Sequence, residues 1–481
     1  MQRASGVLMH ISSLNGDYSI GSFGKEALEF IDRISDAGFG WWQVLPFCPV
    51  DECNSPYKSQ ATFGLNPYFI DLEELYKKGL LSKEELEESK QKNMYCCEFD
   101  RLYSERLSVL KAAANRVCDK TQIKEFIDSH KYIRQFCEYM ALKEQNDQKP
   151  WNEWKIDKAD EDIMFVWEFI EYEFFMQWQK IKAYANSKGV KIIGDVPIYV
   201  SYESADVWAN KELFLLDDDF SPKCVAGVPP DYFCKDGQLW GNPLYDWQRM
   251  KEDGYSWWLD RMRHMFMMFD GVRIDHFRGI ESYWSVPYGA LSAREGKWEK
   301  GPGESFIEAI KEISEDRLII AEDLGDITKE VEMLVEKSGF PGMRVFQFGF
   351  LGEENSPHMP HNYNNKTVVY TGTHDNNTLL GYVWEQNEHE RAAMLEYCGY
   401  FEKDWDKCYD SIFRTIYASG ALLTIFPIQD LLGYGADTRL NTPGVAKGNW
   451  SYRVTKKQLD EINWKKFKRF NNLYARTTKG E

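Results

Sequence analysis

The chain has 481 residues, of which 43% are hydrophobic and 28% are charged, so it can bury a large core and is not a low-complexity disordered protein. Its 58 basic and 76 acidic residues give a formal net charge of −18, which disfavours nucleic acids and anionic membranes as partners because like charges repel. An uncharged ligand such as a sugar meets no such repulsion, and the 15% of aromatic residues suits stacking on the apolar faces of pyranose rings.

The start of the chain carries no targeting signal that we recognise. Residues 1–14 lack a basic segment followed by a sustained apolar run, and no stretch is long and apolar enough to span a membrane. Ten cysteines are scattered without a CxxC pair or a His–Cys cluster, and the acidic LLDDDF at 215–220 does not have the spacing of an EF-hand. We therefore expect a cytoplasmic protein with free thiols and no metal site.

Eight short apolar runs recur along the chain, and each is followed by a polar turn and a helix-like stretch. They cover residues 6–11, 42–46, 190–196, 271–275, 318–322, 343–348, 367–371 and 422–426. Apolar strands that alternate with helices indicate a parallel sheet covered on both faces, and eight such units favour a closed barrel over an open sheet. The sequence predicts an α/β protein in which residues 1–481 form a single (β/α)₈ TIM barrel with inserted subdomains.

Two long gaps between these runs predict the insertions. Residues 71–188 are dominated by Glu, Lys, Leu and aromatic residues at helical spacing, and Ser82 followed three residues later by Glu85 matches a capping box. Residues 201–258 are instead rich in Gly, Pro, Asp and aromatic residues, which is typical of loops. We expect a mostly helical insertion at 71–188 and a loop-rich insertion at 201–258.

Three of the expected strands end in a carboxylate. The fourth ends in GVRIDHFRG, the fifth in IIAEDLG and the seventh in VVYTGTHDNNT, which places Asp275, Glu322 and Asp375 where the apolar runs stop. The active site of a parallel barrel forms at the carboxyl ends of its strands, so these side chains should converge on one rim. Glycoside chemistry requires such a set, because one carboxyl protonates the leaving oxygen while another attacks or stabilises the anomeric carbon.

The neighbours of these carboxylates suggest separate roles. Arg273 lies two residues before Asp275 on the same strand face, where its guanidinium would keep that carboxylate ionised and aimed, as a nucleophile needs. A nearby Asp275 anion would raise the pKa of Glu322, as a proton donor needs. Asp375 and His374 could hold sugar hydroxyls more tightly in the transition state than in the ground state. These assignments predict a retaining catalytic site, with Asp275 as nucleophile, Glu322 as acid/base and Asp375 as their helper.

Each motif taken alone has a structural explanation. An Asp or Glu after a strand often caps a helix, Arg and Asp two residues apart form structural ion pairs, and a single His is often a satisfied core residue. In the loop-rich insertion, Tyr232, Phe233 and Trp240 could fold over a bound glucan, or the loop could be packed by its own aromatic rings. The coincidence of three carboxylates on three strands favours the catalytic interpretation.

Seven motifs make the chain resemble the 4-alpha-glucanotransferase family, also called amylomaltase or disproportionating enzyme, of the α-amylase superfamily. They run from end to end in the order SPYKSQATFGLNPYF, IIGDVPIYV, GVPPDYFCKDGQLWGNPLY, GVRIDHFRG, AEDLG, YTGTHDNNT and TRLNTPG. The resemblance implies a (β/α)₈ barrel with inserted subdomains, no required cofactor, and the same roles for Asp275, Glu322 and Asp375. It also implies substrate contacts, which would be made by Tyr57, Asp195, Trp240, Arg273, His374 and Asn441.

The resemblance implies transfer of α-1,4-glucan segments between maltooligosaccharides or longer glucans, with the loop-rich insertion forming part of the cleft and a monomer or homodimer as the working unit. The sequence departs from the usual family pattern at Asn377, Thr438 and Leu440, none of which is a catalytic carboxylate. From the residues alone, an α-1,4-glucan hydrolase with the same carboxylates remains an alternative, because transfer and hydrolysis differ in acceptor binding and water exclusion. A non-catalytic glucan-binding protein is the second alternative, although it would not need all three carboxylates.

Overall fold

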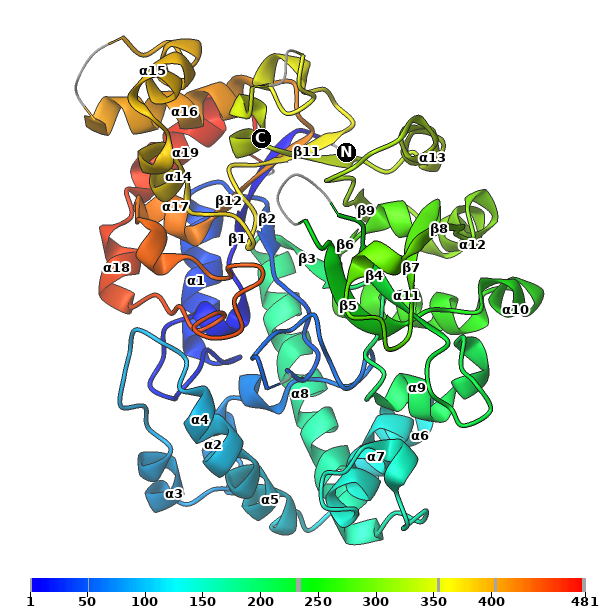
Figure 1. Cartoon of the computed structure of the whole chain (residues 1–481). Coiled ribbons are helices and arrows are strands. Elements are labelled where there is room, and N and C mark those ends of the chain that lie inside the picture. The colour runs from blue at the N-terminus through cyan, green and yellow to red at the C-terminus, as the bar shows by residue number, and fades with distance from the viewer. Residues whose placement is uncertain (1, 51, 231–234, 353–354, 402–404, 478–481) are drawn as a thin grey trace.

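The computed structural model describes residues 2–50, 52–230, 235–352, 355–401 and 405–477, and its centre is a closed barrel of eight parallel strands (Figure 1). All eight strands follow one another around the barrel in chain order, and the last pairs with the first to close it. The strands are β1 (Ala4–Leu8), β2 (Trp41–Gln43), β3 (Lys191–Val196), β6 (Gly271–Ile274), β9 (Leu318–Ala321), β10 (Gly342–Val345), β11 (Thr367–Tyr370) and β12 (Leu423–Pro427). The predicted fold class is therefore confirmed, and every predicted run overlaps one of these strands.

The strands are apolar along their length because both of their faces are buried. All residues of β1, β2, β6, β11 and β12 are buried, since the barrel interior is filled by side chains and helices cover the outside. The outer layer includes α1 (Lys25–Asp36), α8 (Glu161–Ser187), α11 (Ser256–Met268), α12 (Glu304–Ser314), α13 (Lys329–Ser338), α14 (Leu379–Glu385), α15 (Glu388–Tyr397), α16 (Trp405–Ala418), α17 (Ile428–Leu432) and α19 (Trp464–Leu473).

The segment 71–188 consists of helices and short connections. It contains α2 (Leu72–Lys77), α3 (Lys83–Glu88), α4 (Phe99–Arg101), a π-helical turn at Leu102–Arg106, α5 (Leu107–Asn115), α6 (Thr121–Ser129), α7 (Lys131–Gln145) and α8. The capping box predicted for α3 is present, since Ser82 and Glu85 each accept a hydrogen bond from the other's backbone N–H. In Figure 1 the helices α2 to α7 lie beneath the barrel on either side of α8, which connects this layer to β3.

The segment 201–258 is more regular than the expected loop. It contains α9 (Ala205–Ala209), β4 (Cys224–Val228), β5 (Gln238–Pro243) and α10 (Trp247–Glu252). The two strands join β7 (Ser282–Pro287) and β8 (Lys297–Lys300) in an antiparallel sheet of order β5-β4-β7-β8. The pairing of β4 with β7 joins residues about sixty positions apart, which explains why local composition indicated only a loop.

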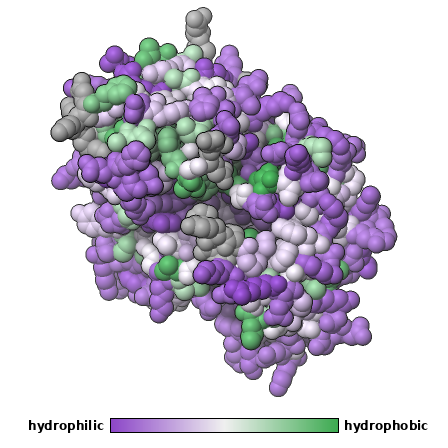
Figure 2. Space-filling view, turned by 45° about the horizontal axis from the view of Figure 1, so that its top comes forward, coloured by the Kyte–Doolittle hydropathy of each residue, from purple (hydrophilic) through white to green (hydrophobic). Residues whose placement is uncertain are grey.

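The surface agrees with the charge of the chain. The face in Figure 2 is mainly hydrophilic, with hydrophobic residues in small groups. Within the described parts of the chain, no helix has both the length and the apolar character needed to cross a membrane.

Candidate active site

Asp275 and Glu322 follow neighbouring strands of the barrel at equivalent positions. Ile274 at the end of β6 pairs with Ala321 at the end of β9, and the N–H of Glu322 donates to the carbonyl of Ile274 at 3.1 Å. The register therefore sets the two carboxyl groups side by side on the rim formed by the carboxyl ends of the strands. Asp375 reaches the same rim from the loop between β11 and α14.

Arg273 joins two carboxylates from two neighbouring strands. One guanidinium nitrogen donates to Asp195 Oδ2 on β3 at 2.6 Å, and another donates to Asp275 Oδ1 at 2.5 Å. Although burial opposes the charge, Asp195 and Asp275 raise the pKa of Arg273 well above its ordinary value. A permanently charged, bidentate guanidinium thus fixes the direction of the Asp275 side chain.

Glu322 is held by backbone groups and lies against a like charge. Its Oε2 accepts the N–H of His276 at 2.7 Å and its Oε1 accepts the N–H of Leu324 at 3.0 Å. Burial, and after it the repulsion of Asp275, raise the pKa of Glu322 to about 8. The carboxyl group is therefore protonated at neutral pH and can act as a proton donor.

Asp375, in contrast to Glu322, is held in its ionised form. Its Oδ1 accepts the amide of Asn441 at 2.6 Å, and its Oδ2 lies 3.3 Å from His374 Nε2. Burial by itself would raise its pKa, but the charge and hydrogen bond of His374 together with the bond from Asn441 lower it to about 2. Asp375 is thus a carboxylate at any working pH, and 46% of its side chain is exposed for contact with a ligand.

Tyr57 connects Asp195 and its Arg273 partner with His374 and Asp375. Its hydroxyl donates to Asp195 Oδ2 at 2.8 Å and lies 3.4 Å from His374 Nδ1, while its ring stacks on the His374 ring at 4.9 Å and 16°. The raised pKa of Tyr57, caused first by burial and then by Asp195, keeps the hydroxyl protonated as a donor. Residues from five separate parts of the chain therefore form one connected network.

The structure brings all nine predicted site residues to this rim. Trp240 lies on β5, and its ring meets the His276 ring edge-on at 4.9 Å. Asn441 contacts Asp375 directly, as His374 does, and Arg273 contacts Asp275 in the same way. Tyr232 and Phe233 lie outside the described residues.

Two residues of the site were not predicted. His276 has a left-handed backbone (φ 50°), which turns its N–H toward Glu322. Arg439 donates to the carbonyl of Asp375 at 2.5 Å. Both stand inside motifs that the sequence singled out, GVRIDHFRG and TRLNTPG, but nothing in the local pattern shows which backbone group each one would meet.

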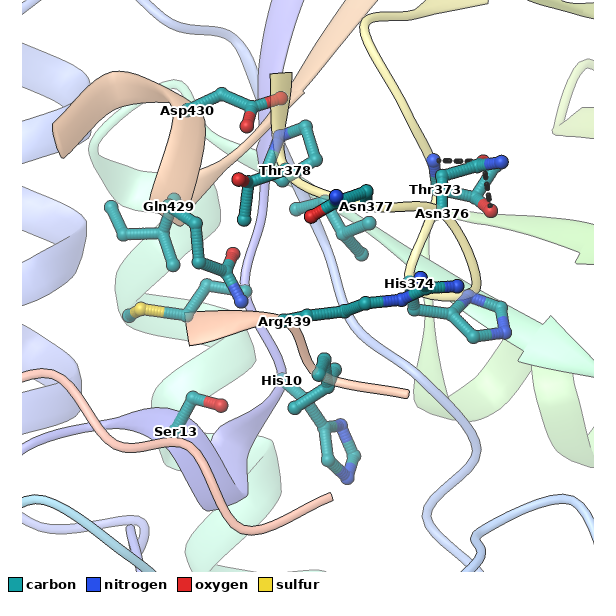
Figure 3. Close-up of a pocket in the computed structure, with 15 residues that line it drawn as sticks. His10, Ser13, Thr373, His374, Asn376, Asn377, Thr378, Gln429, Asp430 and Arg439 are labelled. Carbon is teal, nitrogen blue, oxygen red and sulfur yellow. Dashed lines mark hydrogen bonds between the residues drawn. The ribbon is translucent and has the colours of Figure 1, made fainter. Parts of the chain in front are cut away.

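A small cavity lies behind the loop that carries His374 and Asp375 (Figure 3). Its volume is about 20 Å³, and its lining includes His10, Thr378, Gln429, Asp430 and Arg439. That volume holds a single water and no larger ligand. Among the described residues, no group of three or more His, Cys, Asp or Glu side chains could hold a metal ion.

A family model, curated relatives and a solved structure all point to the same family of proteins. Residues 9–459 match the family described as 4-alpha-glucanotransferase. The chain is 42% identical to a 4-alpha-glucanotransferase of Streptococcus pneumoniae, covering 95% of this chain and 94% of that one, and 40% identical to one from Clostridium butyricum, covering 97% and 100%. It also resembles the solved amylomaltase of Streptococcus agalactiae in complex with acarbose, with 37% identity, a TM-score of 0.94 and coverage of 99% and 100%.

Proposed function

The chain belongs to the 4-alpha-glucanotransferase family, and from this premise we propose that it moves α-1,4-glucan segments from a maltooligosaccharide or amylose to the 4-hydroxyl of another glucose or glucan. Family membership favours transfer over the hydrolase that the residues alone left open. The intact set of three carboxylates also argues against a protein that only binds glucans.

The observation that carries the mechanism is the difference between two neighbouring carboxyl groups. Asp275 is held by the Arg273 guanidinium at 2.5 Å, whereas burial and the Asp275 charge raise the pKa of Glu322 to about 8. A charged nucleophile beside a protonated acid is the arrangement that a retaining double displacement requires.

In the first step, an Asp275 oxygen attacks C1 of an α-linked glucose while Glu322 gives its proton to the departing O4. This forms a covalent bond between C1 and Asp275 and breaks the glycosidic bond. In the second step, Glu322, now a carboxylate, removes the proton from an acceptor 4-hydroxyl as that oxygen attacks C1 and releases Asp275. Two inversions at C1 retain the α-configuration.

The remaining predicted residues would hold the sugar ring that reacts. Asp375, ionised and partly exposed, and His374 beside it are suited to accept and donate hydrogen bonds to sugar hydroxyls. Tyr57 and Asp195 extend the same network, and Trp240 offers a half-buried ring for stacking at the edge of the second sheet. Asn441 contacts Asp375, which supports a role in orienting that carboxylate, with or without direct contact to the glucan.

The larger organisation follows from the same proposal. We propose that residues 1–481 act as one catalytic barrel, with 71–188 as a helical insertion and 201–258 as part of the wall of the glucan cleft. The position of Trp240 beside His276 supports the second assignment. We propose that the protein is a cytoplasmic monomer or homodimer. We also propose that it does not bind nucleic acid, because its net charge of −18 repels phosphate groups.

The test is incubation of the purified protein with maltotriose, with glucose, longer products and total reducing ends measured together. Transfer predicts glucose plus a ladder of longer maltooligosaccharides at constant reducing ends, and Asp275→Asn should abolish both. A steady rise in reducing ends would mean hydrolysis. No reaction with maltotriose or longer maltodextrins would overturn the catalytic assignment.

A further inference from the structure

The loop that carries His374 and Asp375 is fixed at both of its ends by one buried side chain. Asp430, on α17 directly after β12, is fully buried. Its Oδ2 accepts the hydroxyl of Thr371 at 2.5 Å, and its Oδ1 accepts the N–H of Leu379 at 2.7 Å. Thr371 and Leu379 are the residues where the loop leaves β11 and where it enters α14.

Among the residues that the structure describes, no ion pair explains why Asp430 is buried. Within the part of the chain that the structure describes, no cation lies within ion-pair distance of it, and burial raises its pKa to about 7. A buried carboxyl group without a cation is unfavourable for the fold. Its two hydrogen bonds, both to the ends of the catalytic loop, are therefore its evident role.

The helix α17 also supports the segment 438–441, which contacts His374 and Asp375. Gln429, next to Asp430, donates to the carbonyl of Thr438 at 3.1 Å and so holds the turn that precedes Arg439. Arg439 donates to the Asp375 carbonyl, and the N–H of Asn441 donates to the His374 carbonyl at 3.2 Å. Figure 3 shows Arg439 extending from the segment after α17 toward His374.

The packing between this loop and α17 is incomplete at one place. The cavity of about 20 Å³ separates it from α17 and is lined by Thr378 and His374 on one side and by Gln429, Asp430 and Arg439 on the other. Close-packed interiors resist displacement, whereas a cavity leaves room for it. The position of the loop therefore depends on directed contacts. At its ends these are the hydrogen bonds of Asp430, and between them are the bond from Gln347 to the Asn377 carbonyl at 2.8 Å, the contacts of Tyr57 with His374, and the bonds from Arg439 and Asn441.

We propose that Asp430 is a positioning residue for the transfer reaction, which it serves by fixing the loop that presents His374 and Asp375 to the sugar. The inference rests on the proposed function and deepens it. Asp430 does not touch the substrate, and it acts through the loop on contacts that tighten in the transition state. Its loss should therefore lower kcat more than it raises KM.

The main test compares Asp430→Ala with Asp430→Asn in maltotriose disproportionation. Alanine removes both acceptors, and a displacement of the loop by about 1 Å should lower kcat by about 100-fold. Asparagine keeps an acceptor for the Leu379 N–H and can donate to the Thr371 hydroxyl, so it should stay within about fivefold of the unmodified protein. Thr371→Val removes only one of the two bonds and should give an intermediate kcat.

Asp270→Ala is the matched control for a merely structural aspartate. Asp270 also ties two segments, accepting from the Ile192 N–H and the Asn186 amide, both at 2.8 Å, but it lies at the opposite, N-terminal end of the strands. Its replacement should lower the melting temperature without lowering the kcat of the folded protein, because that end of a barrel serves stability.

A second glycosyl donor shows whether the loss of Asp430 acts through Asp375 or through Glu322. An aryl maltotrioside with an acidic phenol needs no proton from Glu322, so release of the phenol should still be slow in Asp430→Ala if the effect passes through Asp375. Recovery of the rate with this donor would overturn the inference, and so would an unchanged kcat in folded Asp430→Ala. If that variant does not fold, an unchanged kcat in Thr371→Val overturns it. Absence of disproportionation by the unmodified protein would instead refute the proposed function.

Discussion

The protonation of Glu322 provides the sharpest test of the mechanism. An ordinary glutamate titrates near 4.5, and burial together with Asp275 raises the pKa of Glu322 to about 8. The proton donor is the active form, so activity should be present below the pKa and lost as the pH rises through it. At pH 7 a pKa of 8 leaves about nine-tenths of the sites protonated, whereas a pKa of 4.5 would leave about 0.3%, a roughly 300-fold difference in active enzyme.

The assay is kcat/KM for glucose release from maltotriose, measured from about pH 5 to pH 10 at constant ionic strength. We expect the alkaline limb near pH 8, with about one-tenth of the plateau value left at pH 9. The control is the first step with an aryl maltotrioside that carries an acidic phenol, because its leaving group needs no proton and the limb should disappear. An alkaline limb near pH 5 with maltotriose would refute the assignment of Glu322 as the acid. So would an alkaline limb near pH 8 with both maltotriose and the aryl maltotrioside.

Three further predictions follow from the contacts of the site. Glu322→Gln should stabilise the protein at pH 7. In the unmodified protein the raised pKa of Glu322 means that the folded state keeps a proton that the unfolded chain releases, so the free energy of unfolding falls as the pH rises from 4.5 to 8. This loss is about 3 kcal/mol at pH 7, and glutamine, which carries no titrating proton, avoids it. Urea unfolding should show this gain at pH 7 and none at pH 4, and equal gains at both would contradict the cause. Arg273→Lys should lower kcat for maltotriose by about 100-fold, because one ammonium cannot hold Asp195 and Asp275 in the geometry of the guanidinium, and an unchanged kcat would show that this bridge is dispensable. Asn377→Asp should destabilise the fold by about 1–2 kcal/mol at pH 7, because the amide that donates to Glu385 Oε1 at 2.5 Å becomes a second carboxylate. Thermal unfolding should show that this loss disappears at about pH 4, and an equal loss at both values would exclude repulsion as its cause.

The antiparallel sheet shows where sequence patterns stop being informative. The eight barrel strands could be predicted because burial on two faces makes each of them apolar over several residues. The strand β5 carries no such signal and pairs with β4, while β4, although apolar, pairs with β7 from a later part of the chain. Composition at 201–258 indicated only a loop, because pairing between distant segments is a property of the folded chain.

The ends of the strands explain why the three candidate catalytic carboxylates could be placed together from the sequence. Parallel strands end on one rim, so an apolar run that stops at a carboxylate places that group near the others whatever the rest of the fold does. Asp275, Glu322 and Asp375 are identified in this way by local pattern and by the motifs around them. The same reasoning identified Arg273, because two residues on one strand face need no other segment to meet.

The sequence by itself thus determined the barrel, its rim and the three carboxylates that stand on it. The tertiary structure decided which groups set their states: Asp195 and Tyr57 around Arg273, Asn441 and Arg439 around Asp375, and Asp430 beneath the loop. The reason is physical. Periodicity records whether a side chain is buried, whereas a pKa or a hydrogen bond depends on which distant atoms meet it after the chain has closed into a barrel.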